Sequence, residues 1–474
     1  MRIPRVMSTQ HPDNVEMPFF AKQSHFDGED EIKEAYYVFS HLDIEEQMWD
    51  FEGKEVDDFV IKKLLSTYPE FFRNNVIGQD VRITPRVPNP EVERDEAKLL
   101  AETLEMIPRS FDYARKFYDD PSPPIFEIIV PMVTKSEELE RIYLFYRDFV
   151  AGKSKLTLAD GTRVGDWLGE FEPETIGVIP LFEDIPAMLR CDEIAGEFAD
   201  GKFDSMRVFL ARSDPALNYG FIPATLAAKI ALQKLYDLET DVHPIIGVGC
   251  PPFRGSFDPE NMHALVEYPS VQTFTAQSAF KYDYDFGVAR KAVEELRDSG
   301  PDKPQDVEVD ETIIQRLSAE YRRRVPQIAE FVNETGKFVP KRRMRKLHIG
   351  LFGYSRGDRV RLPRAITFCA VMYSIGFPPE LIGISALGDK DYEDVCESIP
   401  TLESQMEFVL SHFNPESLRI VPFEDDVKRA MELFDFEPRE DYLIATGRTI
   451  NSIRKQNGIG DAIIESGKLR RFLG

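Results

Sequence analysis

The sequence predicts an α/β fold and, within that class, a closed (β/α)8 barrel of the TIM type with additional helices packed around it. The first observation is a series of short runs rich in β-branched and other apolar residues. Most are apolar on both faces, as buried parallel strands are. These runs span residues 81–84, 126–133, 175–182, 206–211, 243–248, 271–276 and 347–353. The second observation is that helical patterns follow several runs, which implies a parallel sheet with helical crossovers. A closed barrel accommodates this number of strands better than an open sheet, and no GxGxxG motif follows the first run.

Two helices are clear in the sequence pattern. Residues 135–151 carry apolar side chains at helical spacing, with Thr134 and Glu137 as an expected capping box and Gly152 as the expected stop. Residues 221–238 predict a second helix. Other helical patterns lie outside the alternation and are expected to pack around the barrel: residues 30–50, 92–118, 308–335 and 402–412.

The whole chain, residues 1–474, is expected to form one catalytic barrel domain. Helical insertions are expected at about residues 30–118, 298–345 and 400–445. Two stretches, residues 119–124 and 298–307, are predicted loops, and neither has the character of a linker between domains.

Composition excludes several classes of function. Hydrophobic residues make up 42% and charged residues 30%, which is ordinary for a globular chain, and the net charge of −25 argues against nucleic acid or an anionic membrane as a partner. No stretch approaches the roughly 20 apolar residues of a membrane span, and the first residues lack the apolar segment of a signal peptide. The four cysteines form no CxxC pair. We therefore expect a reduced chain in the cytoplasm.

Histidine usage narrows the choice of metal. The chain has seven histidines with no HxH and no HExxH pattern, so a His-rich metal site is not expected. Any metal is expected to be a hard ion bound by oxygen atoms, such as Mg²⁺ or Mn²⁺.

Polar residues directly follow the predicted strands, at the end where barrel active sites lie. Carboxylates follow two of the runs, at Glu183-Asp184 and at Asp214. Arg82 lies inside the run 81–84, and the other polar residues at these ends are Arg86, Arg212, Ser213, Arg254, Gln277, Ser278, Lys281, Ser355, Arg356, Arg359, Arg361 and Arg364. Carboxylates together with arginines suit a divalent cation bound with an anionic substrate, such as a phosphate or carboxylate.

Structural interpretations of the same residues remain open. Asp184 before Pro186, and Asp214 before Pro215, could simply open helices. Arg82 could be a charge at a strand edge. His11 lies in a polar, proline-bearing loop of a kind that is usually just surface.

Three further stretches have similarly plain interpretations. The basic run 341–345 is expected to be a solvated loop, and Arg322 to Arg324 the surface of a helix. Residues 49–54 (WDFEGK) fit aromatic packing at a helix end about as well as a functional role.

Five segments, in order along most of the chain, resemble phosphoenolpyruvate carboxylases, and most closely their short archaeal-type branch. Residues 7–14 (MSTQHPDN) resemble the family's histidine motif, and Pro180 to Glu183 its metal-binding glutamate motif. The remaining segments resemble the metal-binding aspartate motif, the glycine- and arginine-rich loop, and the later arginine-bearing strand: they are Ser213-Asp214 with Gly220, Phe253 to Gly255, and Tyr354 to Arg356 through Pro363 to Ile366.

The chain departs from the longer branch of that family, and the departures fit the short branch. Gln10, Asp13 and Asn14 replace residues of the longer histidine motif, and Leu217 stands where a lysine is expected. The Gly247–Pro252 loop lacks a histidine and a first arginine, and a later arginine motif is replaced around residues 373–376.

The resemblance implies that the chain combines phosphoenolpyruvate with bicarbonate to give oxaloacetate and phosphate, as a homotetramer. It implies Glu183 and Asp214 as ligands of Mg²⁺ or Mn²⁺ and His11 as general base on carboxyphosphate. It also implies substrate contacts: Arg356 and Arg364 for the phosphate, Arg82 or Arg86 for another group, Arg254 on a closing loop, and Gln277 and Ser355 beside them.

Two rival functions share parts of this pattern. Another Mg²⁺-dependent barrel acting on phosphoenolpyruvate or pyruvate, a lyase or aldolase, would use the same carboxylates and arginines without bicarbonate. A non-catalytic barrel that binds an acidic metabolite would need neither the general base His11 nor an arginine on a loop able to close.

Overall fold

The eight strands form a closed parallel barrel in which each strand pairs with the next along the chain and β8 pairs with β1. The computed structural model describes residues 2–23, 25–52, 56–343 and 361–474. The strands are β1 (Val6–Ser8), β2 (Glu46–Asp50), β3 (Arg82–Arg86), β4 (Glu127–Val130), β5 (Gly177–Phe182), β6 (Ser205–Ala211), β7 (Asp241–Gly247) and β8 (Thr273–Ala276). This confirms the predicted fold class.

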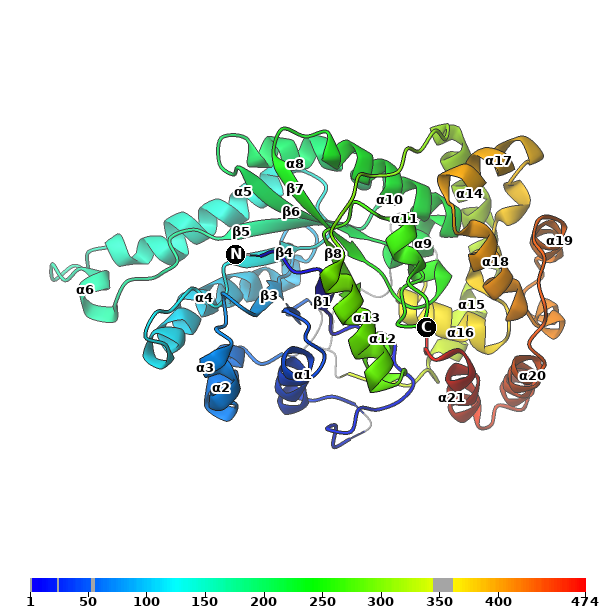
Figure 1. Ribbon diagram of the computed structural model, residues 1–474, viewed down its shortest axis with the longest axis horizontal. Coiled ribbons are helices and arrows are strands. Elements are labelled where there is room, and N and C mark those ends of the chain that lie inside the picture. Colours follow the sequence, from blue (N-terminus) through cyan, green and yellow to red (C-terminus); the bar gives the residue numbers. More distant parts are fainter. Residues whose placement is uncertain (1, 24, 53–55, 344–360) are drawn as a thin grey trace.

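Helices cover the outside of the barrel (Figure 1). Those up to residue 298 are α1 (Gly28–Ser40), α2 (Val60–Thr67), α3 (Pro69–Asn74), α4 (Ala97–Phe117), α5 (Ser136–Leu144), α6 (Val164–Leu168), α7 (Ile185–Met188), α8 (Cys191–Ala199), α9 (Ser213–Tyr219), α10 (Phe221–Tyr236), α11 (His263–Glu267), α12 (Ser278–Tyr282) and α13 (Phe286–Asp298). The later ones gather on one side of the barrel: α14 (Glu311–Arg324), α15 (Ala329–Gly336), α16 (Ala365–Ser374), α17 (Asp389–Ser398), α18 (Leu402–Ser411), α19 (Glu424–Leu433), α20 (Glu440–Lys455) and α21 (Ile459–Arg470).

The barrel interior is filled in layers by side chains from different strands. Its middle is apolar, formed by Met7, Met48, Ile129, Ile179, Leu181, Phe209, Ala211 and Ile245. At the amino-terminal end of the strands, Arg207 binds Glu46 with both terminal nitrogens, at 2.8 and 2.7 Å. The interior is therefore a packed core, and the ends of the strands, above all the carboxyl-terminal end, are where a substrate could bind.

Six of the seven predicted strands are confirmed as β3 to β8, and the run 347–353 lies outside the described residues. Two strands were missed. The predicted helix 30–50 is wrong in its second half, because α1 ends at Ser40 and β2 begins at Glu46. His11 was expected to precede any regular element but follows the three-residue strand β1.

The expected helix 135–151 is correct in place and wrong in detail. Lys135 stands at the N-cap without a side-chain hydrogen bond, and Thr134 donates to Glu138 at 2.7 Å instead of forming a capping box with Glu137. The helix continues as a π-helix over Phe145–Val150 and a 3-10 turn over Ala151–Lys155, so Gly152 does not stop it.

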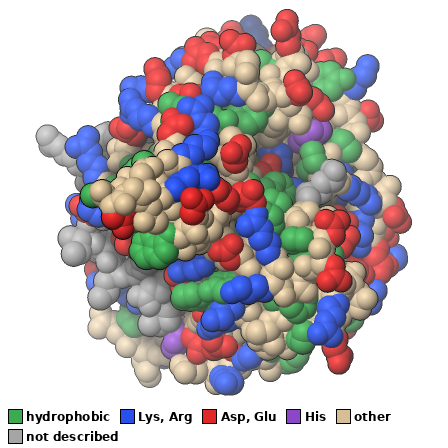
Figure 2. Space-filling model, turned by 90° about the vertical axis from the view of Figure 1, so that its left-hand side faces the viewer, with side chains coloured by type: hydrophobic (Ala, Val, Ile, Leu, Met, Phe, Trp, Pro, Cys, Tyr) green, Lys and Arg blue, Asp and Glu red, His purple; other side chains and the backbone are tan. Residues whose placement is uncertain are grey.

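The outer surface mixes acidic and basic side chains, as Figure 2 shows for the face at the left of Figure 1. The segment around α6 projects on that side and carries five of the large exposed apolar residues: Phe149, Leu156, Leu158, Trp167 and Leu168. Within the described part of the chain, no single helix is long and apolar enough to cross a membrane. One sharply bent pair, α16 with residues 379–386, passes that test on length and composition alone.

Candidate active site at the carboxyl ends of the strands

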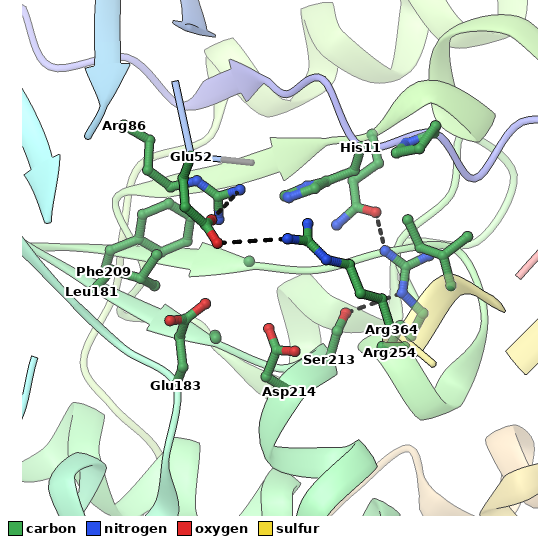
Figure 3. A pocket seen from close by; sticks show the side chains of 16 residues that line it. His11, Glu52, Arg86, Leu181, Glu183, Phe209, Ser213, Asp214, Arg254 and Arg364 are labelled. Atoms are coloured by element: carbon green, nitrogen blue, oxygen red, sulfur yellow. Dashed lines mark hydrogen bonds and ion pairs between the residues drawn. The ribbon is translucent and has the colours of Figure 1, made fainter. Parts of the chain in front are cut away.

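A pocket of about 700 Å³ opens at the carboxyl-terminal end of the barrel. Residues from the ends of seven strands and from the start of α16 line it, and Figure 3 shows them with ten labelled. The lining residues are His11, Pro12, Glu52, Arg86, Leu181, Glu183, Phe209, Ala211, Ser213, Asp214, Gly247, Arg254, Gln277, Arg364, Ala365 and Ile366. The structure therefore brings most of the predicted site residues together in one place.

His11 follows β1 and lies on one wall of the pocket. Its Nδ1 atom lies 3.1 Å from the hydroxyl of Thr9, which fixes the ring. The backbone on both sides is anchored to the segment after β8, because Thr9 N–H donates to the carbonyl of Ala276 at 3.0 Å and Ser278 N–H donates to that of His11 at 3.2 Å. The interpretation of His11 as a surface residue is therefore wrong.

Glu183 and Asp214 point into the pocket from the wall opposite His11 (Figure 3). Glu183 directly follows β5 and is buried, and Asp214 lies in the first turn of α9 after β6. Both segments do open helices, as the plain interpretation expected: Asp184 stands at the N-cap of α7, although its side chain makes no bond to the helix, and α9 begins at Ser213 with Arg212 as its N-cap.

Arg254 is fully buried on the 3-10 turn Pro252–Arg254 (η4) that follows β7. Its Nε donates to Ser213 at 3.0 Å, Nη1 to Asp13 at 3.1 Å, and Nη2 to the side-chain oxygen of Gln277. These three partners come from the ends of different strands. The guanidinium is thus held across the pocket by groups from β6, β1 and β8.

Arg86 ends β3 and is held by two carboxylates from the end of β2. Burial alone would lower the pKa of Arg86, but the charges of Asp50 and Glu52 outweigh it and hold that pKa well above its usual value. Oε2 of Glu52 lies 2.9 Å from Nη2 of Arg86, and its Oε1 lies 3.7 Å from Nη2 of Arg364, which directly precedes α16. Glu52 therefore bridges an arginine of the barrel and an arginine of the C-terminal helices.

Glu93 lies beside this group and is buried. Burial and the neighbouring charge of Glu52 raise the pKa of Glu93 to about 7. Two carboxyl groups, those of Glu52 and Glu93, and two arginines, Arg86 and Arg364, thus lie together at the pocket, where an anionic substrate can exchange partners with them.

Arg82 does not join the pocket, so the expectation that it contacts the substrate is wrong. It opens β3, and its guanidinium binds Glu127 and the carbonyl of Arg2 in a second cavity at the other end of the barrel. Arg212 also turns away, since it donates to Tyr268 and Thr225 at 2.8 and 2.9 Å. Ser355, Arg356 and Arg359 lie outside the described residues.

The basic run at 341–345 was expected to be solvated; that is correct for Lys341, which is exposed, and wrong for Arg342 and Arg343, which are buried. Arg342 donates to the carbonyl oxygens of Asn14 and Val15, and Arg343 pairs with Glu31 and Glu34 in a buried cluster. Lys281 joins the same cluster, because its Nζ binds Glu34 at 2.8 Å and the carbonyl of Thr9 at 2.9 Å. The cluster supports the segment that carries His11.

Sequence reasoning missed Asp13, Asp50 and Glu52. Asp13 stands in the histidine motif, but nothing in the motif indicates its bond to Arg254. Asp50 and Glu52 were taken as the end of a helix, although Glu46, Met48 and Asp50 alternate along one face as strand residues do. That alternation was the available signal.

The donor set suits a hard cation that is only partly held by protein. Among the described residues, no group of three or more His, Cys, Asp or Glu could enclose a metal ion, whereas Glu183 and Asp214 offer two carboxylates facing one pocket. Mg²⁺ and Mn²⁺ are commonly bound this way, by one or two carboxylates with water and substrate oxygens completing the shell.

Comparison with known proteins identifies the relatives of this chain. The family model described as "Phosphoenolpyruvate carboxylase" matches residues 3–474. The chain is 49% identical to the phosphoenolpyruvate carboxylase of Methanothermobacter thermautotrophicus over the full length of both, and 46% identical to that of Halobacterium salinarum over 100% of this chain and 99% of the other. Among solved structures, a malate synthase of Haloferax volcanii covers 91% of the chain with a TM-score of 0.38 and 10% identity.

Proposed function

The chain belongs to the phosphoenolpyruvate carboxylase family, and from that premise we propose that the pocket of His11, Glu183, Asp214 and Arg254 joins phosphoenolpyruvate to bicarbonate. The observation that carries the proposal is the meeting of three carboxylates, three arginines and one histidine in one pocket at the carboxyl ends of the strands (Figure 3). Both substrates are anions, so the arginines can bind them there through charge-assisted hydrogen bonds.

Glu183 and Asp214 are the residues that would hold Mg²⁺ or Mn²⁺. Their oxygen atoms suit either ion, and the substrate's own oxygens would complete the coordination. When bound, the ion supplies positive charge where the enol oxygen of the substrate becomes negative.

The first step transfers the phosphoryl group. An oxygen of bicarbonate attacks the phosphorus, the bond from phosphorus to the enol oxygen breaks, and carboxyphosphate and the enolate of pyruvate result. Arg364 and Arg254 flank the pocket and are the described candidates to hold the transferring group. Arg356 and Ser355, which the family resemblance also implies, remain predictions because they lie outside the described residues.

The second step releases and recaptures CO₂. In the tautomer in which Nδ1 of His11 donates to Thr9, Nε2 is the base that removes the carboxyl proton of carboxyphosphate. The carbon–oxygen bond to phosphate then breaks, giving CO₂ and phosphate, and the enolate carbon attacks CO₂ to give oxaloacetate.

Water must stay out of the pocket between these steps, because an enolate that gains a proton on carbon becomes pyruvate. Arg254 is fully buried and spans the pocket from a turn rich in glycine and proline, so it is the described residue best placed to exclude water.

We also propose that the chain works as one catalytic unit, since Arg364 of the C-terminal helices lines the same pocket as the strand ends. A homotetramer remains part of the proposal, as the family resemblance implies. Light scattering on the purified chain tests it.

The experiment that tests the function is oxaloacetate formation from phosphoenolpyruvate, Mg²⁺ and bicarbonate, coupled to malate dehydrogenase and NADH. We expect turnover that stops when bicarbonate is left out. Turnover of phosphoenolpyruvate that continues unchanged without bicarbonate would contradict the proposal and favour a barrel lyase.

A further inference from the structure

The turn that carries Arg254 is held from outside the barrel by one buried carboxylate. Glu380 lies on the 3-10 turn Pro379–Leu381 (η6), after α16. Its Oε1 atom accepts the backbone N–H of Phe253 at 2.7 Å and the hydroxyl of Tyr373 at the end of α16. Phe253 directly precedes Arg254, so the bond fixes the peptide from which Arg254 extends.

The buried position of Glu380 is energetically unfavourable for a carboxyl group. The residue is 2% exposed, its Oε2 has no hydrogen-bond partner, and no basic side chain of the described residues pairs with it. Burial raises the pKa of Glu380 to about 7. A buried carboxyl group without a basic partner lowers stability, so packing alone does not account for this residue.

Arg254 has little freedom to compensate for a shift of its backbone. Its side chain already reaches Ser213, Asp13 and Gln277, which come from three different strand ends. The turn is closed on itself as well, because Gly249 N–H donates to the carbonyl of Arg254 at 2.8 Å and a Cβ on Gly249 would lie 2.9 Å from the guanidinium carbon.

The same carboxylate joins two walls of the pocket. Through Tyr373 it contacts α16, which begins directly after Arg364, and through Phe253 it contacts the turn of Arg254. Phe253 also packs on Phe368 of α16, with ring centroids 5.9 Å apart. Glu380, itself on a turn of the C-terminal helices, thus holds the turn of Arg254 from the side of those helices.

We propose that Glu380 is a positioning residue for carboxylation: it ties the Phe253–Arg254 peptide to the C-terminal helices and so aims Arg254 into the pocket. The inference rests on the proposed role of Arg254 in excluding water.

The test compares two substitutions of nearly equal size. Glu380→Met removes the acceptor for the Phe253 N–H, whereas Glu380→Gln keeps an oxygen in its place. For Glu380→Met we expect kcat/KM for phosphoenolpyruvate to fall roughly 10- to 100-fold, the range that a misplaced catalytic group produces. The fraction of turnover that ends as pyruvate, read with lactate dehydrogenase against malate dehydrogenase, is expected to rise. Glu380→Gln is expected to restore both values to near those of the unchanged chain.

Tyr373→Phe is the matched control for general damage to this part of the core. It removes the other hydrogen bond to Glu380 but leaves the bond to Phe253, so Tm is expected to fall while the pyruvate fraction stays unchanged. Glu380→Asp withdraws the acceptor by one methylene and serves if Glu380→Met does not fold. It is also expected to raise the pyruvate fraction.

Arg254→Lys separates this inference from the proposed function. If it leaves the pyruvate fraction unchanged, the role given to Arg254 is wrong and the inference about Glu380 fails with it. If Arg254→Lys raises that fraction but the folded Glu380 variants lower only Tm, Glu380 is an ordinary core residue and the inference alone is overturned.

Discussion

Arg86 at the end of β3 binds Asp50 at the end of β2 through two parallel hydrogen bonds, with Nε 2.7 Å from Oδ1 and Nη2 2.9 Å from Oδ2. Both residues are buried, and the pair joins neighbouring strands where the barrel opens into the pocket. Since Arg86 also binds Glu52 at 2.9 Å, it sets the position of the carboxylate that faces Arg364.

Arg86→Met should therefore both destabilise the barrel and impair catalysis. Removing one partner of a buried pair leaves an uncompensated charge, which costs about 3–5 kcal/mol of the free energy of unfolding. Urea unfolding measures this, and the coupled assay is expected to show a large loss of kcat/KM.

Arg147 provides the control for that prediction. It binds Asp148 with the same two-point geometry, at 2.6 and 2.8 Å, but on the exposed surface. Arg147→Met is expected to change neither stability nor activity appreciably, because exposed pairs contribute little. An equal loss in both variants would show that burial does not decide the effect.

Glu183→Gln and Asp214→Asn should each weaken the binding of Mn²⁺, used as a probe of the cation site. An amide keeps the shape of the side chain but lacks the charge that a hard cation requires, so we expect a loss of more than about 10-fold in affinity by titration calorimetry. Phosphoenolpyruvate turnover should fall with it.

Asp184→Asn is the matched control for the cation site, since Asp184 is the next carboxylate along the chain and accepts the hydroxyl of Tyr219 instead. It is expected to bind Mn²⁺ as the unchanged chain does. Equal weakening in the Glu183 and Asp184 variants would mean that Glu183 is not a specific ligand.

His11→Asn is expected to retain binding of phosphoenolpyruvate with Mg²⁺ but to lose oxaloacetate formation by about 10²- to 10⁴-fold, the range for loss of a general base. Binding can be followed by the rise of Tm with substrate, and turnover by the coupled assay. The asparagine keeps polarity but cannot accept the proton of carboxyphosphate.

His41→Asn controls for the loss of a histidine. Its Nδ1 also contacts a hydroxyl, that of Ser40 at 2.6 Å, but it lies after α1 and away from the pocket. Activity should be unchanged. Full carboxylation by His11→Asn would remove the general base from the proposal.

Strands were easiest to predict from the sequence where both faces are mostly apolar, as in β4 and β5, and β2 was missed because its face toward the barrel interior is charged. Glu46, Met48 and Asp50 of β2 belong to one face, but two of the three are carboxylates. Their partners, Arg207 on β6 and Arg86 on β3, are brought to them only by closure of the barrel. The local sequence pattern of one strand does not indicate ion pairs with residues on other strands.

The candidate site was predictable wherever a residue directly follows a recognised strand, as Glu183, Asp214 and Gln277 do. Arg82 was misplaced because it lies inside the predicted strand 81–84 but was grouped with the residues at the strand ends, whereas β3 runs from Arg82 to Arg86 and begins with Arg82. A shift of two residues along a strand moves a side chain from one end of the barrel toward the other.

The stability of the chain should depend on pH through Glu380. Burial raises the pKa of Glu380 from 4.5 to about 7, so the folded state holds this proton more tightly than the unfolded state does. The contribution of Glu380 to the free energy of unfolding is therefore greatest below pH 4.5 and falls as pH rises through 7, by about 3 kcal/mol in all. Glu380→Gln has no proton to lose, so its stability relative to the unchanged chain should increase from pH 5 to pH 7 and level off toward pH 8 in urea unfolding.

Glu320→Gln gives the opposite comparison over the same range. Hydrogen bonds from Arg323 and Arg324 lower the pKa of Glu320 to about 2, so this group stays charged in both the folded and unfolded states above pH 5. The difference in the free energy of unfolding between Glu320→Gln and the unchanged chain should therefore remain constant from pH 5 to pH 8. If the stability of Glu380→Gln relative to the unchanged chain is also constant from pH 5 to pH 8, Glu380 is ionised over this whole range. A positively charged group, in addition to its contacts Phe253 and Tyr373, then keeps it ionised.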